Sequence, residues 1–425
     1  MADAWAQTAL GAICRFQAGD AFGRDDQGRT VGDHPFIKVS DMNLVGNEIY
    51  ISRANNWVSD DEAQQNYRLH PKDAVVFAKI GIALTYNRRR RLVRPTVIDN
   101  NMMSAVPAPD VDPIWFYYLL STIDFNLISA GSALPYLTVK DLSRIQIGVP
   151  AKREQQAIAS VLGPLDDKIE LNRRTNETLE AMARAIFKDW FVDFGPTRAK
   201  MEGRPPYLAP DIWSLFPERL DNEGTPEGWR AGKLGDVAHQ VGQTVSPETL
   251  DPNTPYIGLE HMPRRSIALS DWEGAGKVTS GKLAFRKCDF LFGKLRPYFH
   301  KVGIAPLDGI CSTDIVVLNA RERSAAAFVL VCISQDEFVA FTDRTSDGTK
   351  MPRTSWGRME RYSVCLPDEA VLDAFNAITN PTLDRIVANI HESRTLAATR
   401  DLLLPKLMSG EVRVKDAEKF VGKIA

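Results

Sequence analysis

The chain has 425 residues, too many for one compact hydrophobic core, and its length predicts at least two domains. Hydrophobic residues make up 44% and charged residues 25%, as in ordinary water-soluble globular proteins, and no apolar run is long enough to span a bilayer. The N-terminus lacks the basic and then apolar pattern of a signal peptide, so we expect a cytoplasmic protein without a membrane segment. Five cysteines without a CxxC pair and six scattered histidines disfavour a disulfide framework and a metal site.

The basic residues are unevenly distributed, although the net charge is only −2. Residues 74–98 contain no acidic side chain, and residues 277–301 contain Asp289 alone. A basic face of this kind is sufficient to contact phosphates. Because the two segments lie in different halves of the chain, they are the first indication of a repeat. Their basic residues are Lys79, Arg88, Arg89, Arg90, Arg91 and Arg94 in the first, and Lys277, Lys282, Arg286, Lys287, Lys294, Arg296 and Lys301 in the second.

The first predicted elements, taken in chain order, form a mixed α/β region. Residues 74–79 are a short apolar run that ends in a lysine and predicts a strand. Residues 113–129 have helical periodicity and length. Thr138 is a predicted N-cap of a short helix, with Asp141 at its third position.

Two helices are predicted after Pro150. Residues 154–162 form a short one that Gly163 and Pro164 end, and a longer one of about 27 residues, or about 40 Å, then runs to about Phe191. The inward positions of the longer helix alternate in steps of four and three, which is the spacing of a coiled-coil seam. Its length favours a rigid spacer between domains over the alternative of a helix that covers only its own domain. The seam positions are Leu165, Ile169, Asn172, Asn176, Leu179, Ala183, Ile186 and Trp190.

Elements of the same kind follow in the second half. Residues 195–226 are rich in Pro and Gly and predict a linker. Residues 290–294 then predict a strand that ends in a lysine, residues 324–343 predict a helix, and Ser355 is a predicted N-cap.

A second long helix near the C-terminus carries a less regular seam. Asn389 in it is equivalent to Asn172 in the first, so the two amides are expected to face each other across an antiparallel pair, where polar seam residues can fix register. The seam positions are Ile386, Asn389, Ser393, Leu396, Arg400, Leu403 and Leu407.

One constant interval links the two halves. The interval from Asp167 to Asp384 also links residues 131–135 to 348–352 and residues 147–150 to 364–367. Several matches that share one interval predict an internal repeat, and small shifts upstream are what loop insertions produce.

Motifs for catalysis are missing or incomplete. Residues 276–283 approach a phosphate-binding loop, but Leu283 stands where a Ser or Thr would bind Mg²⁺, so a basic hairpin is the better interpretation. Residues 166–168 contain half of a nuclease signature, but they lie on the predicted coiled-coil helix. We find no glycine-rich cofactor motif, no methyltransferase motif and no GxSxG nucleophile, which predicts a non-catalytic protein.

The repeat and its two helices resemble the specificity (S) subunit of type I restriction-modification systems. Residues 131–142 and 147–150 look like the end of a target recognition domain in that family, and residues 154–159 look like the start of its first conserved helical region. Residues 190–196 and 407–412 resemble the ends of the two conserved regions. The second copy departs from the pattern, since it has no counterpart of Gln155-Gln156, which puts in doubt the symmetry of a second partner contact.

The resemblance implies an α+β chain in which two mixed α/β target recognition domains are joined by two long antiparallel coiled-coil helices as a pseudo-twofold internal repeat. Each recognition domain would read one half of a bipartite target in double-stranded DNA, and the helices would set the spacer. Two modification (methyltransferase) subunits would dock on the helices, and restriction (nuclease/translocase) subunits would add cleavage for phage defence. S-adenosylmethionine, ATP and Mg²⁺ would belong to those partners, with no cofactor in this chain. The implied regions are recognition domain 1 at 1–150, helical region 1 at 151–194, the linker at 195–226, recognition domain 2 at 227–367 and helical region 2 at 368–425.

Candidate DNA contacts follow from side-chain chemistry, because basic groups neutralise phosphates and Arg, Lys, Asn or Gln read base edges. For the run of four arginines the alternative is a solvated turn. For the whole chain the alternatives are a DNA enzyme with an unrecognised site and a coiled-coil scaffold without DNA binding, and salt-sensitive DNA affinity separates the scaffold from a reader. We expect phosphate contacts from Arg88, Arg89, Arg90, Arg91, Arg94, Lys287 and Lys301, base contacts from Lys79, Asn87, Arg264, Arg265, Lys294 and Arg296, and stacking from Tyr86 and Tyr298.

Overall fold

The computed structural model describes residues 5–23, 27–131 and 134–422. The chain divides into two compact units. Unit 1 comprises Met1–Leu171 together with Thr395–Ala425, and unit 2 comprises Asn172–Arg394. Each unit mixes helices with small sheets and includes part of two long helices, which confirms the predicted fold class.

The described residues of unit 1 form three sheets. A two-stranded antiparallel ladder joins β1 to β10, a five-stranded sheet has the order β2-β9-β6-β7-β4, and a three-stranded sheet has the order β5-β3-β8. The predicted strand at 74–79 is β6, a central strand that is buried along its whole length. The strands are β1 (Ala6–Ala9), β2 (Cys14–Ala18), β3 (His34–Ile37), β4 (Tyr50–Ile51), β5 (Asn56–Val58), β6 (Val75–Ala78), β7 (Arg90–Leu92), β8 (Val97–Ile98), β9 (Met102–Pro107) and β10 (Gln146–Val149).

Unit 2 also contains three sheets. Its ladder joins β11 to β21, and its larger sheets have the orders β12-β20-β17-β18 and β13-β16-β19-β14-β15. The predicted strand at 290–294 is the buried strand β17. The strands are β11 (Arg230–Lys233), β12 (Ala238–Gln240), β13 (Thr244–Val245), β14 (Pro255–Ile257), β15 (Glu273–Gly274), β16 (Lys282–Phe285), β17 (Phe290–Gly293), β18 (Val302–Ile304), β19 (Gly309–Cys311), β20 (Ile315–Ala320) and β21 (Ser363–Leu366).

The two units repeat one topology. The ladder β1–β10 corresponds to β11–β21, and both are antiparallel. The order β2-β9-β6 corresponds to β12-β20-β17. The short parallel pair of β3 with β8 corresponds to that of β14 with β19, and unit 1 has a further parallel pair, β4 with β7. The internal repeat predicted from the sequence is therefore confirmed in the strand order.

Shorter helices connect these strands. The helix predicted at 113–129 is the shorter α4 followed by a 3₁₀ turn, and the one predicted at 324–343 is two helices, α10 and α11. Thr138 caps α5 by accepting a hydrogen bond from the Asp141 amide, whereas Ser355 precedes α12 without a cap bond. The short helices are α1 (Leu10–Ile13), α2 (Asp60–Asn66), α3 (Ile82–Thr85), α4 (Pro113–Thr122), α5 (Val139–Ser143), α7 (Gly195–Met201), α8 (Pro210–Trp213), α9 (Leu234–Val237), α10 (Ala326–Ile333), α11 (Asp336–Arg344), α12 (Trp356–Met359) and α14 (Val414–Val421), with 3₁₀ turns η2 (Val39–Asn43), η3 (Phe125–Leu127), η4 (Pro247–Thr249), η5 (Leu259–His261), η6 (Ala275–Lys277), η7 (Pro297–Phe299) and η8 (Arg323–Ala325).

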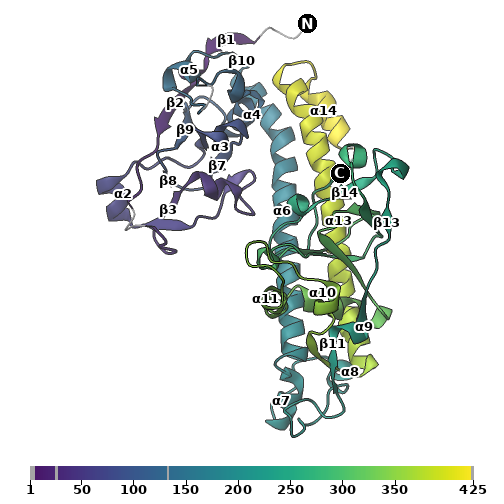
Figure 1. Cartoon of the computed structure of the whole chain (residues 1–425). Coiled ribbons are helices and arrows are strands. Elements are labelled where there is room, and N and C mark those ends of the chain that lie inside the picture. Colours follow the sequence, from purple (N-terminus) through teal and green to yellow (C-terminus); the bar gives the residue numbers. More distant parts are fainter. Residues whose placement is uncertain (1–4, 24–26, 132–133, 423–425) are drawn as a thin grey trace. The chain divides into compact units, whose positions relative to one another are not determined.

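Two helices of 40 residues each, α6 (Lys152–Phe191) and α13 (Glu369–Met408), lie alongside each other (Figure 1). The predicted break at Gly163-Pro164 is wrong, because Pro164 lies inside the continuous helix α6. A proline in a helix interior costs about 3 kcal/mol. Its neighbours Leu162 and Leu165 are almost fully buried, and their packing offsets that cost.

Hydrogen bonds show that the two helices are antiparallel. Within unit 2, Asn172 Nδ2 donates to Glu392 Oε2 at 2.8 Å and Asn389 Nδ2 donates to Asn176 Oδ1 at 2.8 Å. The expected pairing of Asn172 with Asn389 is therefore wrong by one helical turn. A shift by one turn keeps the same seam positions facing inward, so the sequence pattern alone does not distinguish the two registers.

The seam positions point inward to different degrees. Ile169, Leu179 and Ile186 on α6 are half-buried. The buried predicted positions are Leu165, Asn172, Asn176, Ala183 and Trp190 on α6 and Ile386, Asn389, Leu396, Leu403 and Leu407 on α13.

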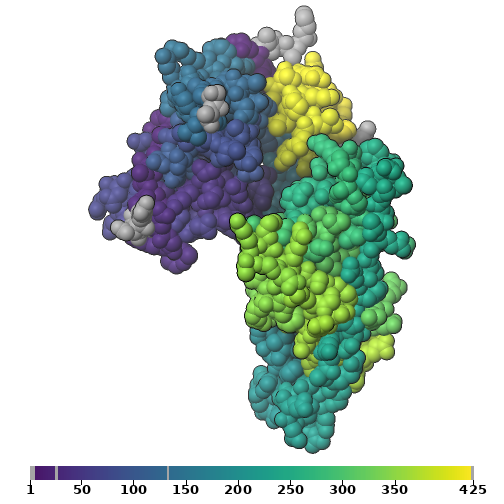
Figure 2. Space-filling model, viewed as in Figure 1, coloured from purple at the N-terminus to yellow at the C-terminus, as the bar shows by residue number. Residues whose placement is uncertain are grey.

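Each unit has its own hydrophobic core, and the long helices contribute to both. In unit 2 the Phe375 ring of α13 lies 5.0 Å from that of Phe191 and 5.9 Å from that of Trp190, both on α6. In unit 1, Leu403 and Leu407 from the end of α13 and Ala417 from α14 belong to the core of the N-terminal domain. Figure 2 shows this C-terminal segment, in yellow, against the N-terminal part of unit 1.

The connecting segment 195–226 is folded. It contains α7 and α8, and its residues Ala199 and Phe216 are buried.

Among the described residues no single helix has the length and apolar character needed to cross a membrane. One pair of helices bent by 70°, Arg323–Ile333 with Asp336–Arg344, meets that criterion only when the two are taken together.

Candidate nucleic-acid interface

A lysine follows the central buried strand of each unit. Lys79 follows β6 and Lys294 follows β17, and both are half-buried. The carbonyl of Lys79 accepts from the Leu137 amide at 2.9 Å, and that of Lys294 accepts from the Thr354 amide at 3.0 Å. The two lysines therefore have equivalent positions, fixed by equivalent backbone bonds.

A short hairpin lies beside each of these lysines. Its ends pair as Ala130 with Tyr136 in unit 1 and as Asp347 with Arg353 in unit 2. Tyr136 also pairs with the residue after Lys79, and Arg353 with the residue after Lys294. Gly131 and Gly348 have φ values of 85° and 87°, a left-handed conformation that favours glycine at the turn. Residues 132–133 of the first hairpin lie outside the described part of the chain.

We call each lysine, the residues that follow it and the hairpin beside it the recognition edge of its unit. Large apolar side chains are exposed there: Ile82 is 74% and Leu134 57% exposed in unit 1, and Met351 is 53% exposed in unit 2. Exposed apolar groups beside lysines and arginines suit a surface that meets both bases and phosphates. Sequence reasoning found Lys79, Tyr86, Lys294, Arg296 and Tyr298 on these edges and missed Ile82, Leu134, Tyr136, Met351 and Arg353, although the repeated 131–135 and 348–352 segments had marked both hairpins.

Two predicted contacts of unit 1 serve the fold instead. Arg89 is 3% exposed, its guanidinium lies 3.6 Å from the ring centre of Phe125, and it donates hydrogen bonds to the carbonyls of Asn87 and Ile123. Burial lowers its pKa to about 9. The Asn87 side chain accepts from the Phe125 amide at 3.0 Å and donates to Asp124. Arg89 is therefore buried and Asn87 is half-buried, and both are committed to bonds within the protein, which makes them poorer candidates for DNA contact.

The other three arginines of the run and Arg94 divide into two pairs. Arg90 donates to the Met42 carbonyl at 3.3 Å, and Arg91 forms an ion pair with Asp73 at 2.7 Å, so both are largely committed to the protein. Arg88 and Arg94 are exposed. Their guanidinium groups lie over the rings of Tyr86 and Trp57, at 4.8 and 5.8 Å. Arg88 also donates to the side-chain oxygen of Asn43, and its other N–H groups can reach a phosphate.

The predicted contacts of unit 2 differ in accessibility. Arg264 and Lys287 are exposed. Arg265 is exposed but pairs with Asp336 at 2.9 Å. Lys301 donates to the Leu259 carbonyl, and burial lowers its pKa, so it is a poorer candidate for a phosphate contact.

Arg296 and Tyr298 lie on the recognition edge of unit 2. Arg296 has a φ of 50°, and its amide donates to the Pro352 carbonyl at 2.7 Å. Its Nε is buried without a hydrogen-bond partner. Tyr298 is 49% exposed, so its ring is available for stacking.

The motif-like segments do not form catalytic sites. Residues 275–277 are a 3₁₀ turn followed by strand β16, so no helix N-terminus is present to bind a phosphate. Asp166 is buried and accepts hydrogen bonds from the Tyr118 hydroxyl at 2.6 Å and from Arg400 at 2.5 Å. Both arrangements are structural.

One group of potential metal ligands, Glu260, His261 and Glu273, lies close together within the described residues. His261 Nδ1 accepts a hydrogen bond from the Gly258 amide at 2.9 Å. The neutral imidazole therefore carries its proton on Nε2, and no lone pair is left for an ion. The group is a poor metal site.

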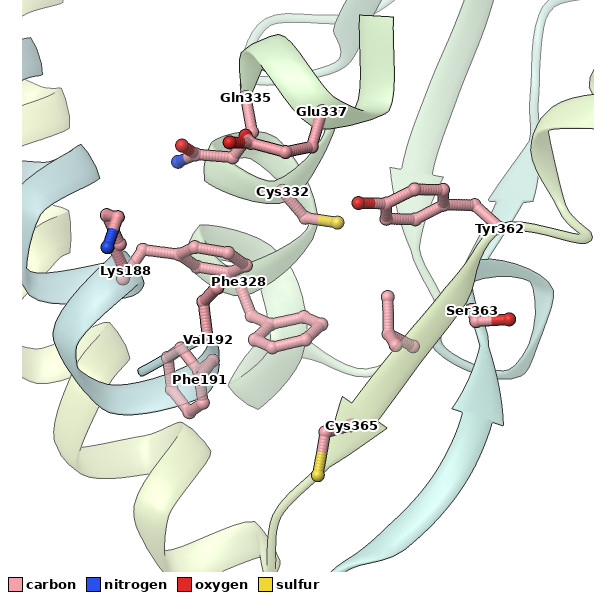
Figure 3. A pocket seen from close by; sticks show the side chains of 12 residues that line it. Lys188, Phe191, Val192, Phe328, Cys332, Gln335, Glu337, Tyr362, Ser363 and Cys365 are labelled. Atoms are coloured by element: carbon pink, nitrogen blue, oxygen red, sulfur yellow. The ribbon is translucent and has the colours of Figure 1, made fainter. Parts of the chain in front are cut away.

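A cavity of about 260 Å³ lies in unit 2 between α6, α10 and β21 (Figure 3). Its walls are formed mainly by aromatic and aliphatic side chains, among them Phe191 and Phe328. The Cys332 thiol points toward the Tyr362 hydroxyl, and burial raises the pKa of both to about 12. Burial thus disfavours the thiolate and the phenolate, the forms that a nucleophile would need.

Known proteins resemble this chain in sequence. Residues 2–181 match the family model of the type I restriction modification DNA specificity domain. The chain is 27% identical over 404 residues to the type I restriction enzyme MjaIX specificity subunit of Methanocaldococcus jannaschii, covering 91% of this chain and 88% of that protein. It is 24% identical over 373 residues to the HindI specificity subunit of Haemophilus influenzae, covering 74% and 81%.

A solved structure supports the fold. The type I restriction-modification S subunit of M. genitalium matches with a TM-score of 0.56 at 14% identity, covering 96% of this chain and 97% of that one. The resemblance inferred from the sequence is thus confirmed, and over nearly its whole length the chain is similar to the DNA specificity subunits of type I restriction-modification systems.

Proposed function

We propose that the chain is a non-catalytic subunit that reads a bipartite DNA target, one half with each unit. The observation that carries the proposal is the repetition of one recognition edge. Both units place a lysine at the end of the central strand, a hairpin beside it and exposed apolar side chains around it. A chain that reads two half-sites needs two such surfaces, whereas a scaffold needs neither.

The partners follow from the same proposal. Two modification subunits bind the chain, and restriction subunits join them to give cleavage. S-adenosylmethionine, ATP and Mg²⁺ are bound by those subunits. The long helices hold the two recognition domains and so determine how many unread base pairs separate the half-sites.

The test is methylation-sensitive genome sequencing of a host that expresses the chain with its neighbouring methyltransferase. We expect adenine methylation at one two-part motif with a constant spacer. Replacing Lys79 by Ala should relax one half of the motif and replacing Lys294 by Ala the other half, because each base contact contributes about 1–3 kcal/mol of discrimination. Lys233→Ala, on the exposed β11 outside both basic segments, is the control and should leave the motif unchanged.

Two other outcomes would redirect the proposal. A soluble complex that leaves no mark and has no salt-sensitive DNA affinity would favour the scaffold. If Lys79→Ala and Lys294→Ala altered the same half of the motif, the assignment of one half to each unit would be wrong.

A further inference from the structure

Helix α6 contains two carboxylates that are almost completely buried. Asp166 is 1% and Glu180 3% exposed. They lie two heptads apart, each one residue after a seam position, Leu165 and Leu179. A buried charge is costly unless hydrogen bonds compensate it, so the partners of these carboxylates show what holds them there.

Glu180 binds a loop of the second recognition domain. It accepts from the Ser266 hydroxyl at 2.7 Å and from the Ile267 amide at 3.1 Å. Arg184, one turn further along α6, lies 3.5 Å from Glu180 and donates to the Arg265 carbonyl at 3.4 Å. Burial raises the pKa of Glu180, and the bonds from Ser266 and Ile267 oppose that shift.

Asp166 has the corresponding role in unit 1. It accepts from the hydroxyl of Tyr118, on α4, at 2.6 Å and forms an ion pair with Arg400, on α13, at 2.5 Å. The adjacent Asp167 accepts from the hydroxyl of Tyr50, on β4, at 2.7 Å. Two side chains of the first recognition domain are thereby attached to one turn of α6.

We propose that Asp166 and Glu180 are positioning residues that fix the orientation of each recognition domain on α6 and thereby restrict the target to one spacer length. The inference rests on the proposed function. Apolar packing is non-directional and tolerates small rotations, whereas hydrogen bonds constrain angle as well as distance. In unit 2 the anchored loop also carries Arg264 and Arg265, which are candidate base contacts, so a rotation at Glu180 would move those side chains relative to the helix.

The experiment measures spacer tolerance directly. The chain and its methyltransferase are expressed with plasmids that carry both half-sites separated by the native spacer or by one base pair more or less. Ser266→Ala and Tyr118→Phe each remove one hydroxyl and little else, and Glu180→Ala removes the unit 2 anchor. The control is Glu177→Gln, a carboxylate on the same helix that pairs with Arg173 at 2.6 Å.

We expect the wild-type chain and Glu177→Gln to prefer the native spacer at least tenfold. The anchor variants should reduce this preference to about threefold or less while the half-site sequences stay the same. A role in stability alone would lower methylation at all spacers equally, and an unchanged preference in Ser266→Ala and Tyr118→Phe would overturn the proposal.

Hydrogen exchange of the purified full-length chain separates this inference from the proposed function. Loss of a bond to a charged acceptor should speed exchange of the Ile267 amide about tenfold in Glu180→Ala and leave it unchanged in Glu177→Gln. Unchanged exchange in Glu180→Ala would show that Glu180 is no anchor. A wild-type chain that exchanges as expected but leaves no two-part mark in the host would contradict the proposed function instead.

Discussion

The adjacent residues Arg88 and Arg89 should respond differently to substitution by methionine. In Arg89→Met the aliphatic part of the side chain is kept, but the bonds to the carbonyls of Asn87 and Ile123 and the contact with the Phe125 ring are lost. Hydrogen bonds from a charged donor contribute about 1.5–3 kcal/mol each, so the loss of these two should lower the unfolding free energy of unit 1 by about 3–6 kcal/mol. Arg88→Met removes an exposed group and should change stability by less than about 0.5 kcal/mol.

The two variants should also differ in how DNA binding depends on salt. If Arg88 contacts one phosphate, Arg88→Met should lower the slope of log affinity against log salt by about 0.9. The assays are urea denaturation followed by a unit 1 probe and DNA binding at several salt concentrations. If Arg89→Met folded with normal stability but bound DNA with a reduced slope, our placement of Arg89 in the protein interior would be refuted.

Two further predictions concern buried polar groups. Burial lowers the pKa of His70 to about 4, whereas an unfolded histidine takes up a proton near pH 6.5, so the unfolding free energy of unit 1 should fall by about 3 kcal/mol as the pH falls from about 6.5 to 4. Urea denaturation across this range should show a loss of stability that His70→Gln lacks, and equal pH dependence in both chains would contradict the burial of a neutral His70. Asn389 donates to Asn176, and its own Oδ1 is buried without a hydrogen bond, so Asn176→Leu alone should lower the unfolding free energy by about 1–3 kcal/mol, whereas Asn176→Leu together with Asn389→Leu should be neutral or stabilising. Urea denaturation of both variants tests this, and equal losses of stability would show that the amide pair stabilises the seam.

The repeated elements could be predicted from the sequence because local patterns determine them. The apolar runs at β6 and β17 are central strands, so nearly every side chain in them is buried and the run is continuous. The spacing of the seam on α6 and α13 follows from helix geometry alone. Thr138 caps its helix because the hydroxyl needs only the amide three residues on.

The features that could not be predicted from the sequence depend on contacts between residues that are distant in the chain. Pro164 is accommodated inside α6 because neighbouring leucines are buried by the rest of unit 1, which a helix-breaking rule does not include. Arg89 turns inward because a ring and two carbonyls meet it there, whereas the run of four arginines looks uniform in sequence. Ile82, Leu134 and Met351 are of residue types that usually lie in a hydrophobic core, and only the fold shows that they are exposed.

The placement of the C-terminal segment has a consequence for the order in which the molecule folds during synthesis. Unit 1 begins first but needs Leu403, Leu407 and Ala417, which leave the ribosome after all of unit 2. Unit 2 is one continuous stretch, Asn172–Arg394, and can therefore complete its core earlier. Until Leu403, Leu407 and Ala417 have emerged, the apolar surface of the first recognition domain that they cover stays open to chaperones, so the unit that begins first is completed after unit 2.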